Sequence, residues 1–396
     1  MKEGWEYKTL GEVCKIYNGN SINADYKKKH FLGATGGLPF IATKDVSPLG
    51  TIEYNNGVRI PNYEDYKVAP ANSVFICAEG GSAGKKFAYV EKDVCFGNKL
   101  FCITPKDKAI TGKFIYNFVQ SDNFRGQFFS LLTGLIGGVS AKKFQTIEIP
   151  VPSLSEQQSI VDYLDSAFAK IDAMKANAEK ALDEAKALFQ ASLKEMLEPK
   201  EGWEEKKFGK ICDFVRGPFG GSLKKECFKE SGYAVYEQQN AIYNKFTFRY
   251  YIDEEKYNSL IRFKVNAGDL IMSCSGTIGK VAIIPEGAKE GIINQALLKL
   301  TPHKEIDAHF LKYLMESKYF EVIINANTEG VAIKNIASVA VLKAIKLHIP
   351  KVSEQLKIVI EIDSLKSKVD KLQANFDKIS QECDALKQAI LRQVFE

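Results

Sequence analysis

Basic side chains lie beside asparagine, glutamine and aromatic residues in three short segments. These are NGNSINADYKKKHF (18–31), RGPFGGSLKKECF (216–228) and YEQQNAIYNKFTFRYY (236–251). Asn and Gln can pair with an adenine edge through two hydrogen bonds, whereas Lys and Arg can bind guanine or phosphate. A lone Lys-Lys pair is usually a solvated surface, but three such clusters favour contact with DNA.

We expect the DNA contacts to come from these clusters together with lysines in neighbouring turns and helices. The candidate residues are Asn20, Asn23, Lys27, Lys28, Lys29, Lys44, Lys85, Lys86, Lys142, Arg216, Ser222, Lys224, Lys225, Gln238, Gln239, Asn240, Lys245, Arg249, Lys280 and Lys334.

Two glycine-rich turns carry a lysine, in NSVFICAEGGSAGKKFAYV (72–90) and GDLIMSCSGTIGKVAII (268–284). Each pattern predicts strand, turn and strand. Neither fits a nucleotide-binding P-loop, because Lys85 and Lys280 are not followed by Ser or Thr. A lysine at a hairpin tip is as compatible with a purely structural turn as with contact to a DNA backbone.

The residues needed for catalysis or metal binding form no pattern. The four histidines lack ligand spacing, the eight cysteines contain no CxxC pair, and no GxSxG or dinucleotide-binding motif occurs. The Asn/Asp-Pro-Pro-aromatic loop of amino-methylating DNA methyltransferases is also missing. We therefore expect a chain that is not an enzyme and binds no metal. Its cysteines should be reduced, as in a cytoplasmic protein, and no apolar run is long enough to cross a membrane.

The chain is a repeat with an offset of 198 residues. EGWEYKTLGEVCKIYNG (3–19) returns as EGWEEKKFGKICDFVRG (201–217), and SEQ at 155–157 returns at 353–355. Between these landmarks the similarity fades. The chain thus reads as variable module, constant segment, variable module, constant segment.

Each constant segment predicts one long helix with a heptad seam. The segments contain no glycine, and their apolar residues step by three and four, which is typical of a coiled coil. The predicted seam residues are Leu164, Ala167, Ile171, Met174, Ala178, Ala181, Ala185, Leu188 and Ser192, then Ile362, Leu365, Val369, Leu372, Phe376, Ile379, Cys383, Leu386 and Ile390.

The two helices should pair in antiparallel orientation, because the first leads out to the second module and the second runs back. Near-complete overlap would place Ala178 opposite Leu372 and Ala185 opposite Leu365. The predicted fold class is α+β, with two duplicated α+β domains related by a pseudo-twofold axis and joined by the helix pair. The predicted boundaries are 1–152, 153–198, 199–351 and 352–396.

Charge is divided in the same way as the repeat. The net charge is +5 for residues 1–154, −4 for 155–198, +5 for 199–352 and −1 for 353–396. Two basic blocks separated by acidic ones favour two modules that each face a polyanion.

These features resemble the specificity subunits of type I restriction–modification systems. The resemblance rests on the GW…LG openings at Trp5 and Trp203, the IPVPSLSEQ junction and its partner, the GTIGKVA turn at 276–282 and the ordered duplication. The first module departs from the pattern in its EGGSAGKKFA turn, which has an extra residue.

The resemblance implies two target recognition domains that each read half of a bipartite double-stranded DNA sequence. Two modification (methyltransferase) subunits would dock on the helices, and restriction subunits would join the full complex. S-adenosylmethionine would be bound by the partner and not by this chain. Two alternatives stay open: a coiled-coil scaffold whose modules bind proteins, and a cryptic nuclease or methyltransferase.

Overall fold

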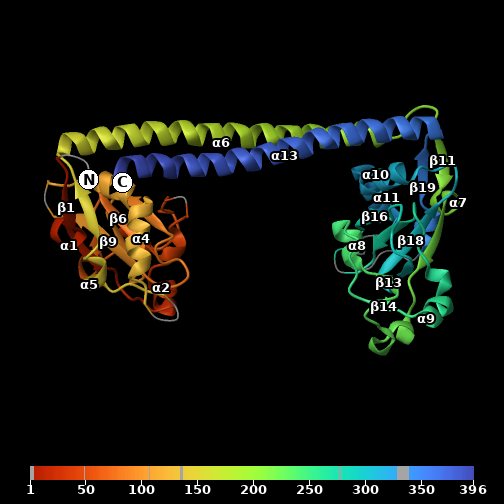
Figure 1. Cartoon of the computed structure of the whole chain (residues 1–396), viewed down its shortest axis with the longest axis horizontal. Coiled ribbons are helices and arrows are strands. Elements are labelled where there is room, and N and C mark those ends of the chain that lie inside the picture. The colour runs from red at the N-terminus through yellow and green to blue at the C-terminus, as the bar shows by residue number, and fades with distance from the viewer. Residues whose placement is uncertain are drawn as a thin grey trace. The chain divides into compact units, whose positions relative to one another are not determined.

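The computed structural model describes residues 4–396 apart from 49, 107, 134–136, 276, 278 and 328–338. The chain forms two compact units, a first unit of Met1–Glu179 with Phe376–Glu396 and a second unit of Lys180–Asn375. Each unit contains part of two 44-residue helices, α6 (Leu154–Leu197) and α13 (Val352–Phe395) (Figure 1). The α+β class and the long helices are as predicted.

The first unit mixes short strands and short helices. Its strands are β1 (Glu6–Thr9), β2 (Cys14–Asn18), β3 (Leu38–Ile41), β4 (Arg59–Ile60), β5 (Val68–Ala69), β6 (Ser73–Cys77), β7 (Phe87–Val90), β8 (Val94–Phe96), β9 (Leu100–Pro105) and β10 (Glu148–Val151). Its short helices are α1 (Leu10–Val13), α2 (Ala24–His30), η1 (Thr43–Asp45), η2 (Tyr63–Asp65), α3 (Gly112–Phe118), α4 (Asp122–Ser130) and α5 (Ala141–Phe144).

The second unit repeats this order, except that an isolated bridge between Lys264 and Ile292 stands in place of a counterpart of β5. Its strands are β11 (Glu204–Lys207), β12 (Cys212–Arg216), β13 (Tyr233–Tyr236), β14 (Tyr251–Ile252), β15 (Leu270–Ser273), β16 (Val281–Ile283), β17 (Gly291–Ile293), β18 (Leu297–Pro302) and β19 (Lys346–Ile349). Its short helices are α7 (Phe208–Ile211), η3 (Gly220–Leu223), η4 (Lys225–Cys227), α8 (Gln238–Tyr243), α9 (Glu254–Ser259), η5 (Ile261–Phe263), α10 (Ala308–Glu316), α11 (Lys318–Asn327) and α12 (Val339–Ala344).

The sheets of the two units have matching topology. An antiparallel sheet has the order β2-β9-β6-β7 in the first unit and β12-β18-β15-β16 in the second. A second sheet contains a parallel pair, β3 with β8 in the first unit and β13 with β17 in the second. The strands that open and close each module pair with each other, β1 with β10 and β11 with β19. Both glycine-rich segments form the predicted hairpins, β6–β7 and β15–β16.

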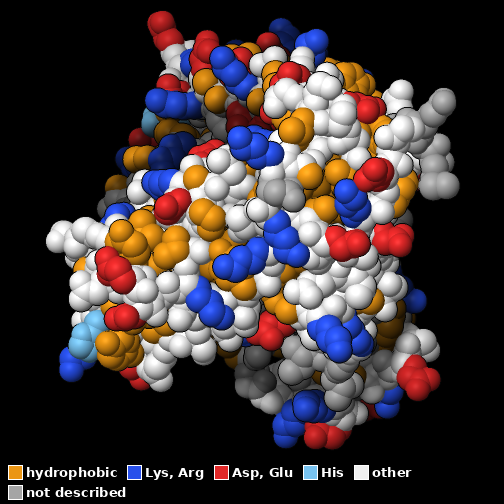
Figure 2. Space-filling view, turned by 90° about the vertical axis from the view of Figure 1, so that its left-hand side faces the viewer, with side chains coloured by type: hydrophobic (Ala, Val, Ile, Leu, Met, Phe, Trp, Pro, Cys, Tyr) orange, Lys and Arg blue, Asp and Glu red, His pale blue; other side chains and the backbone are white. Residues whose placement is uncertain are grey.

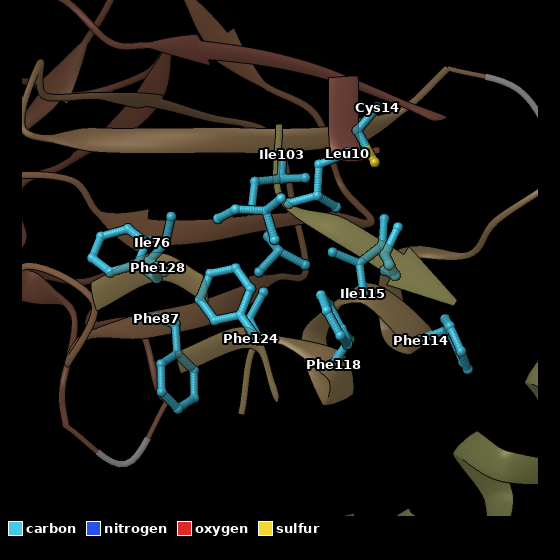
Figure 3. Packing of buried hydrophobic residues seen from close by; sticks show 14 of the residues in the cluster. Leu10, Cys14, Ile76, Phe87, Ile103, Phe114, Ile115, Phe118, Phe124 and Phe128 are labelled. Carbon is cyan, nitrogen blue, oxygen red and sulfur yellow. The ribbon is translucent and has the colours of Figure 1, made fainter. Parts of the chain in front are cut away.

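The central strand β6 is buried on both faces. Because successive side chains of a strand point to opposite sides, Val74 and Ile76 join one hydrophobic cluster, and Phe75 and Cys77 join another. The first cluster includes the phenylalanines of α3 and α4, which Figure 3 shows beside the sheet. The second lies between the two sheets. In β15 of the second unit, Leu270 and Ile271 likewise point to opposite faces and join two different hydrophobic clusters.

The segments around 111–132 and 306–326 carry aromatic and aliphatic residues at continuous helical spacing, but each forms two helices. Ser121 donates to a carbonyl in the last turn of α3 at 2.7 Å and accepts from an N–H in the first turn of α4 at 3.2 Å. Ser317 does the same between α10 and α11, at 2.6 and 3.2 Å. A serine that ends one helix and caps the next breaks the helix while the apolar spacing continues through it.

Within the first unit, the start of α6 and the end of α13 pair in antiparallel orientation. The Cys383 thiol lies 3.9 Å from the Ile171 carbonyl, and Lys387 pairs with Asp172 at 2.6 Å. The predicted pairing, with Ala178 opposite Leu372, would place Ile379 opposite Ile171. The observed contact of Ile171 with Cys383 lies one helical turn further along α13. The ion pair is partly exposed and contributes little, so the apolar seam is the main source of pairing energy.

The heptad spacing is correct, but one of the two seam rows was wrongly assigned. Leu182 is buried, whereas the predicted Met174 and Leu188 are 60% and 66% exposed. Leu372 and Leu386 are also exposed. These residues were predicted to be in the seam because they are apolar. In α6 the buried row lies one residue further along the helix. The exposed residues leave apolar surface on the helices.

A buried glutamine attaches each long helix to its module. Gln157 accepts from the Thr111 backbone N–H at 3.0 Å and donates to two carbonyls at 2.8 and 2.9 Å. Gln355 makes the equivalent bonds, accepting from Asp307 at 2.8 Å and donating at 3.0 and 2.9 Å. Both side chains are fully buried. The repeated Ser-Glu-Gln motif is therefore the joint between helix and module.

The neighbouring glutamate completes each joint. The Trp5 indole donates to Glu156 at 2.7 Å, and the Trp203 indole donates to Glu354 at 2.9 Å. This explains why both tryptophans stand at the openings of the repeats, far in sequence from the helices that they contact.

All eight cysteines are reduced thiols, and seven of them are buried. Burial raises the pKa of Cys95 and Cys274 to about 11, so these two thiols stay protonated at neutral pH. In the described ranges, no helix is both long and apolar enough to cross a membrane.

Replacing Gln355 by Leu should lower the free energy of unfolding by about 2–4 kcal/mol, because a buried N–H and two carbonyls lose their partner. Urea unfolding of the full chain measures the loss. The matched control is Gln381→Leu, at an exposed position of the same helix, for which we expect a change within about 0.5 kcal/mol. Equal stability of both variants would contradict the role of the joint.

Candidate nucleic-acid interface

In the first unit, the lysine cluster is built on helix α2. The Asn23 side chain caps this helix by accepting from the Asp25 and Tyr26 N–H groups at 2.9 and 3.2 Å. Lys28 and Lys29 are exposed in its last turn, where the helix dipole favours cations. Asn23 thus positions the lysines while its carbonyl oxygen is occupied.

Two further residues of this cluster also have local partners. The Lys27 ammonium lies 5.2 Å from the Phe40 ring centre. The Asn20 side-chain oxygen Oδ1 accepts from the Lys67 backbone N–H at 2.7 Å. Among the residues that the structure describes, the Asn20 amide N–H groups have no hydrogen-bond partner, whereas Lys27 is half-buried over the ring.

The β6–β7 hairpin brings a second group of lysines together. Lys86 donates to the Thr43 carbonyl at 3.1 Å, which ties the hairpin to η1, where Lys44 is exposed. Lys85 is exposed at the hairpin itself. Lys142 is exposed on α5, a separate element.

In the second unit, the segment after β12 forms two 3-10 helices. Ser222 donates to the Phe219 carbonyl at 3.0 Å, and Arg216 lies 5.9 Å from the Phe219 ring. Lys224 and Lys225 are exposed at the start of η4. Phe219 is 70% exposed, an aromatic surface next to cations that the basic-residue pattern did not select.

Helix α8 holds the third cluster. Asn240 is fully buried, donates to the Lys245 and Thr247 carbonyls at 2.6 and 3.2 Å, and accepts from the Glu237 N–H at 2.7 Å. The hydrogen-bonding groups of Asn240 thus hold the following loop in this structure, and its contact with DNA stays a prediction. Lys245 is exposed on that loop.

The other side chains of this cluster connect α8 to its surroundings. Gln238 donates to the Ser275 carbonyl, next to the β15–β16 turn that carries the exposed Lys280. Gln239 donates to Glu237 at 3.4 Å, and the Arg249 guanidinium forms an ion pair with the same carboxylate. Lys334 lies outside the described residues.

Sequence reasoning missed two kinds of residue, the buried carboxylate Glu237 and the exposed aromatics Phe219, Tyr243 and Tyr250. The aromatics do stand next to the predicted basic residues in RGPF and FRYY. Figure 2 shows Lys and Arg side chains interspersed with acidic and apolar ones on the face that lies at the left of Figure 1.

Comparison with known sequences matches both repeats. A family model described as the type I restriction modification DNA specificity domain matches residues 2–183 and again residues 200–380. The EcoBI specificity subunit of Escherichia coli is 23% identical over 435 residues, covering 100% of this chain and 86% of that protein. The StySPI specificity subunit of Salmonella potsdam is 27% identical over 205 residues, covering 49% of this chain and 42% of that protein. The matched segment thus spans less than half the length of that relative.

Solved structures share the fold over the whole chain. A chain from a structure of the assembly and conformational transition of a type I R-M system superposes with a TM-score of 0.77 at 19% identity, covering 100% of this chain and 98% of that chain. The HsdS subunit from Thermoanaerobacter tengcongensis gives 0.60 at 19% identity, with 100% and 97% covered. Because the family model matches each repeat in turn, this chain belongs to the type I restriction–modification DNA specificity family.

Proposed function

We propose that this chain is the DNA-recognition subunit of a type I restriction–modification complex. Its variable modules, 1–152 and 199–351, each read one half of a bipartite double-stranded target. The helical segments, 153–198 and 352–396, space the modules and dock two methyltransferase subunits, with restriction subunits joining the full complex. The chain itself is non-catalytic, and S-adenosylmethionine binds to the methyltransferase partner.

One comparison within the chain carries this proposal. After β3, the Ala42 N–H donates to the Asp45 carboxylate at 2.8 Å, and after β13 the Glu237 N–H donates to the Asn240 side chain at 2.7 Å. The same backbone bond is thus kept at equivalent positions while the surrounding side chains differ. A shared framework with different surface residues is what two readers of different half-sites require.

Exposed apolar residues on the long helices support the docking part of the proposal. In the second unit, Val352, Leu356 and Ile360 recur every fourth residue along α13 and are 39%, 45% and 69% exposed. In the first unit, Tyr163 and Met174 of α6 are 51% and 60% exposed. Apolar side chains on one face of a helix suit a protein partner better than they suit DNA.

Exchanging residues 1–150 for the corresponding module of another family member should change one half of the recognised sequence only. The reason is that each module has its own core and its own joint to the helices. Mapping methylated sites in cells that contain the matching methyltransferase subunits measures the result. Changes in both half-sites would show that the modules do not read independently, and a protein-binding scaffold would yield no sequence-specific sites.

Replacing Lys224 and Lys225 together by Ala should weaken DNA binding and lower the salt slope by about two units, because each phosphate contact releases counterions. The measurement is binding to a target duplex between low and high salt, with the complex of this chain and its methyltransferase subunits. The control is the pair Lys366→Ala and Lys368→Ala, exposed lysines on α13. An unchanged slope for the first pair would mean that these lysines are only solvated surface.

A further inference from the structure

Arg249 and Glu237 form an ion pair whose two members differ in exposure. The Arg249 Nε and Nη2 groups donate to the two carboxylate oxygens of Glu237 at 3.0 and 2.9 Å. The Glu237 side chain is 12% exposed, whereas that of Arg249 is 63% exposed. A buried carboxylate therefore holds one edge of an exposed guanidinium in a fixed plane.

Both residues are fixed by their surroundings. Glu237 precedes α8, and its N–H donates to the buried Asn240, which also holds the loop leading to Arg249. The guanidinium lies 5.4 Å from the Tyr250 ring, which stacks on Phe228 at 4.3 Å. The arginine is thus held by a bidentate pair and by an aromatic stack, so little side-chain entropy remains to be lost on binding.

The opposite edge of the guanidinium is available. A guanidinium has five N–H donors in a plane, and the pair with Glu237 uses Nε and one N–H of Nη2. Within the described part of the chain, Nη1 of Arg249 has no hydrogen-bond partner. Nη1 and the second N–H of Nη2 form a parallel pair of donors, the arrangement that matches O6 and N7 of guanine in the major groove.

The charge of the pair favours a base over a phosphate. The Glu237 carboxylate neutralises Arg249 at hydrogen-bond distance, so the pair offers little net attraction to an anion. The neutral guanine edge needs only two aligned donors. A lysine cluster suits phosphate, whereas a neutralised and oriented arginine suits a base edge.

The first unit has no equivalent of this pair at the same position. Ala42 follows β3 where Glu237 follows β13. Arg59, on β4, donates to the carbonyls of Gly36 and Gly37 and so braces its own turn. In the described parts of the two modules, the arginine pair therefore belongs to the second one alone.

We propose that Arg249 reads one guanine in the half-site of the second module and that Glu237 is its positioning residue. This inference rests on the proposed function. It predicts that the wild-type complex prefers that G·C pair by roughly 10–100-fold over other base pairs at the position.

The test uses the complex of this chain with its methyltransferase subunits and a set of duplexes in which each base pair of the second half-site is replaced in turn. Arg249→Ala should lose the preference at one G·C pair and keep it elsewhere. Arg249→Lys should not restore it, because an ammonium lacks the paired donors. Glu237→Gln should weaken the preference at the same base pair only.

The control is Arg262→Ala, an exposed arginine of the same unit, which should leave every preference unchanged. Circular dichroism verifies that each variant is folded. Uniform weakening with a salt slope lower by about one would assign Arg249 to phosphate and overturn the inference. An unchanged preference, or losses at several positions, would also overturn it. If the wild-type complex discriminated no duplex, the proposed function itself would fail.

Discussion

The fold depends on a buried amide at the start of each long helix. Gln157 and Gln355 each bridge their helix to a backbone N–H that precedes α3 or α10 and to two carbonyls of the module. An amide can satisfy a donor and two acceptors at once, which no apolar side chain can do. Because both glutamine side chains are fully buried, any rotation of the helix against its module would leave polar groups unpaired. The joint therefore fixes the orientation of each helix start relative to its own module.

The tryptophan, glutamate and glutamine of this joint are the same in both units, whereas the surface loops of the two modules differ. The opening tryptophan, the Ser-Glu-Gln turn and the paired closing strands repeat in both units with the same contacts. The loops after β3 and β13 differ, and in the second unit they place Arg249 and Lys245 at the surface. In the proposed function, new sequence preferences arise by changing these loops while the joint remains intact.

The fold could be predicted best where the sequence shows a helical period or an internal repeat. The 198-residue offset and the glycine-free segments predicted two matching modules and two long helices. The seam row at Met174 and Leu188 was wrong, because apolar type does not reveal which face of a helix is covered. Residue type also did not reveal that Asn240 is buried, since an amide can hold a loop as well as read a base. The Arg249–Glu237 pair needed the structure, because twelve residues separate its members.

In the proposed function, two modules on one chain read two separate half-sites. Mapping the methylated DNA sites in cells that express this chain with its methyltransferase subunits tests it most directly. The account predicts a bipartite sequence, with two specified segments separated by a gap of fixed length in which any base is accepted. A single uninterrupted recognition sequence, or two segments separated by a variable gap, would contradict it.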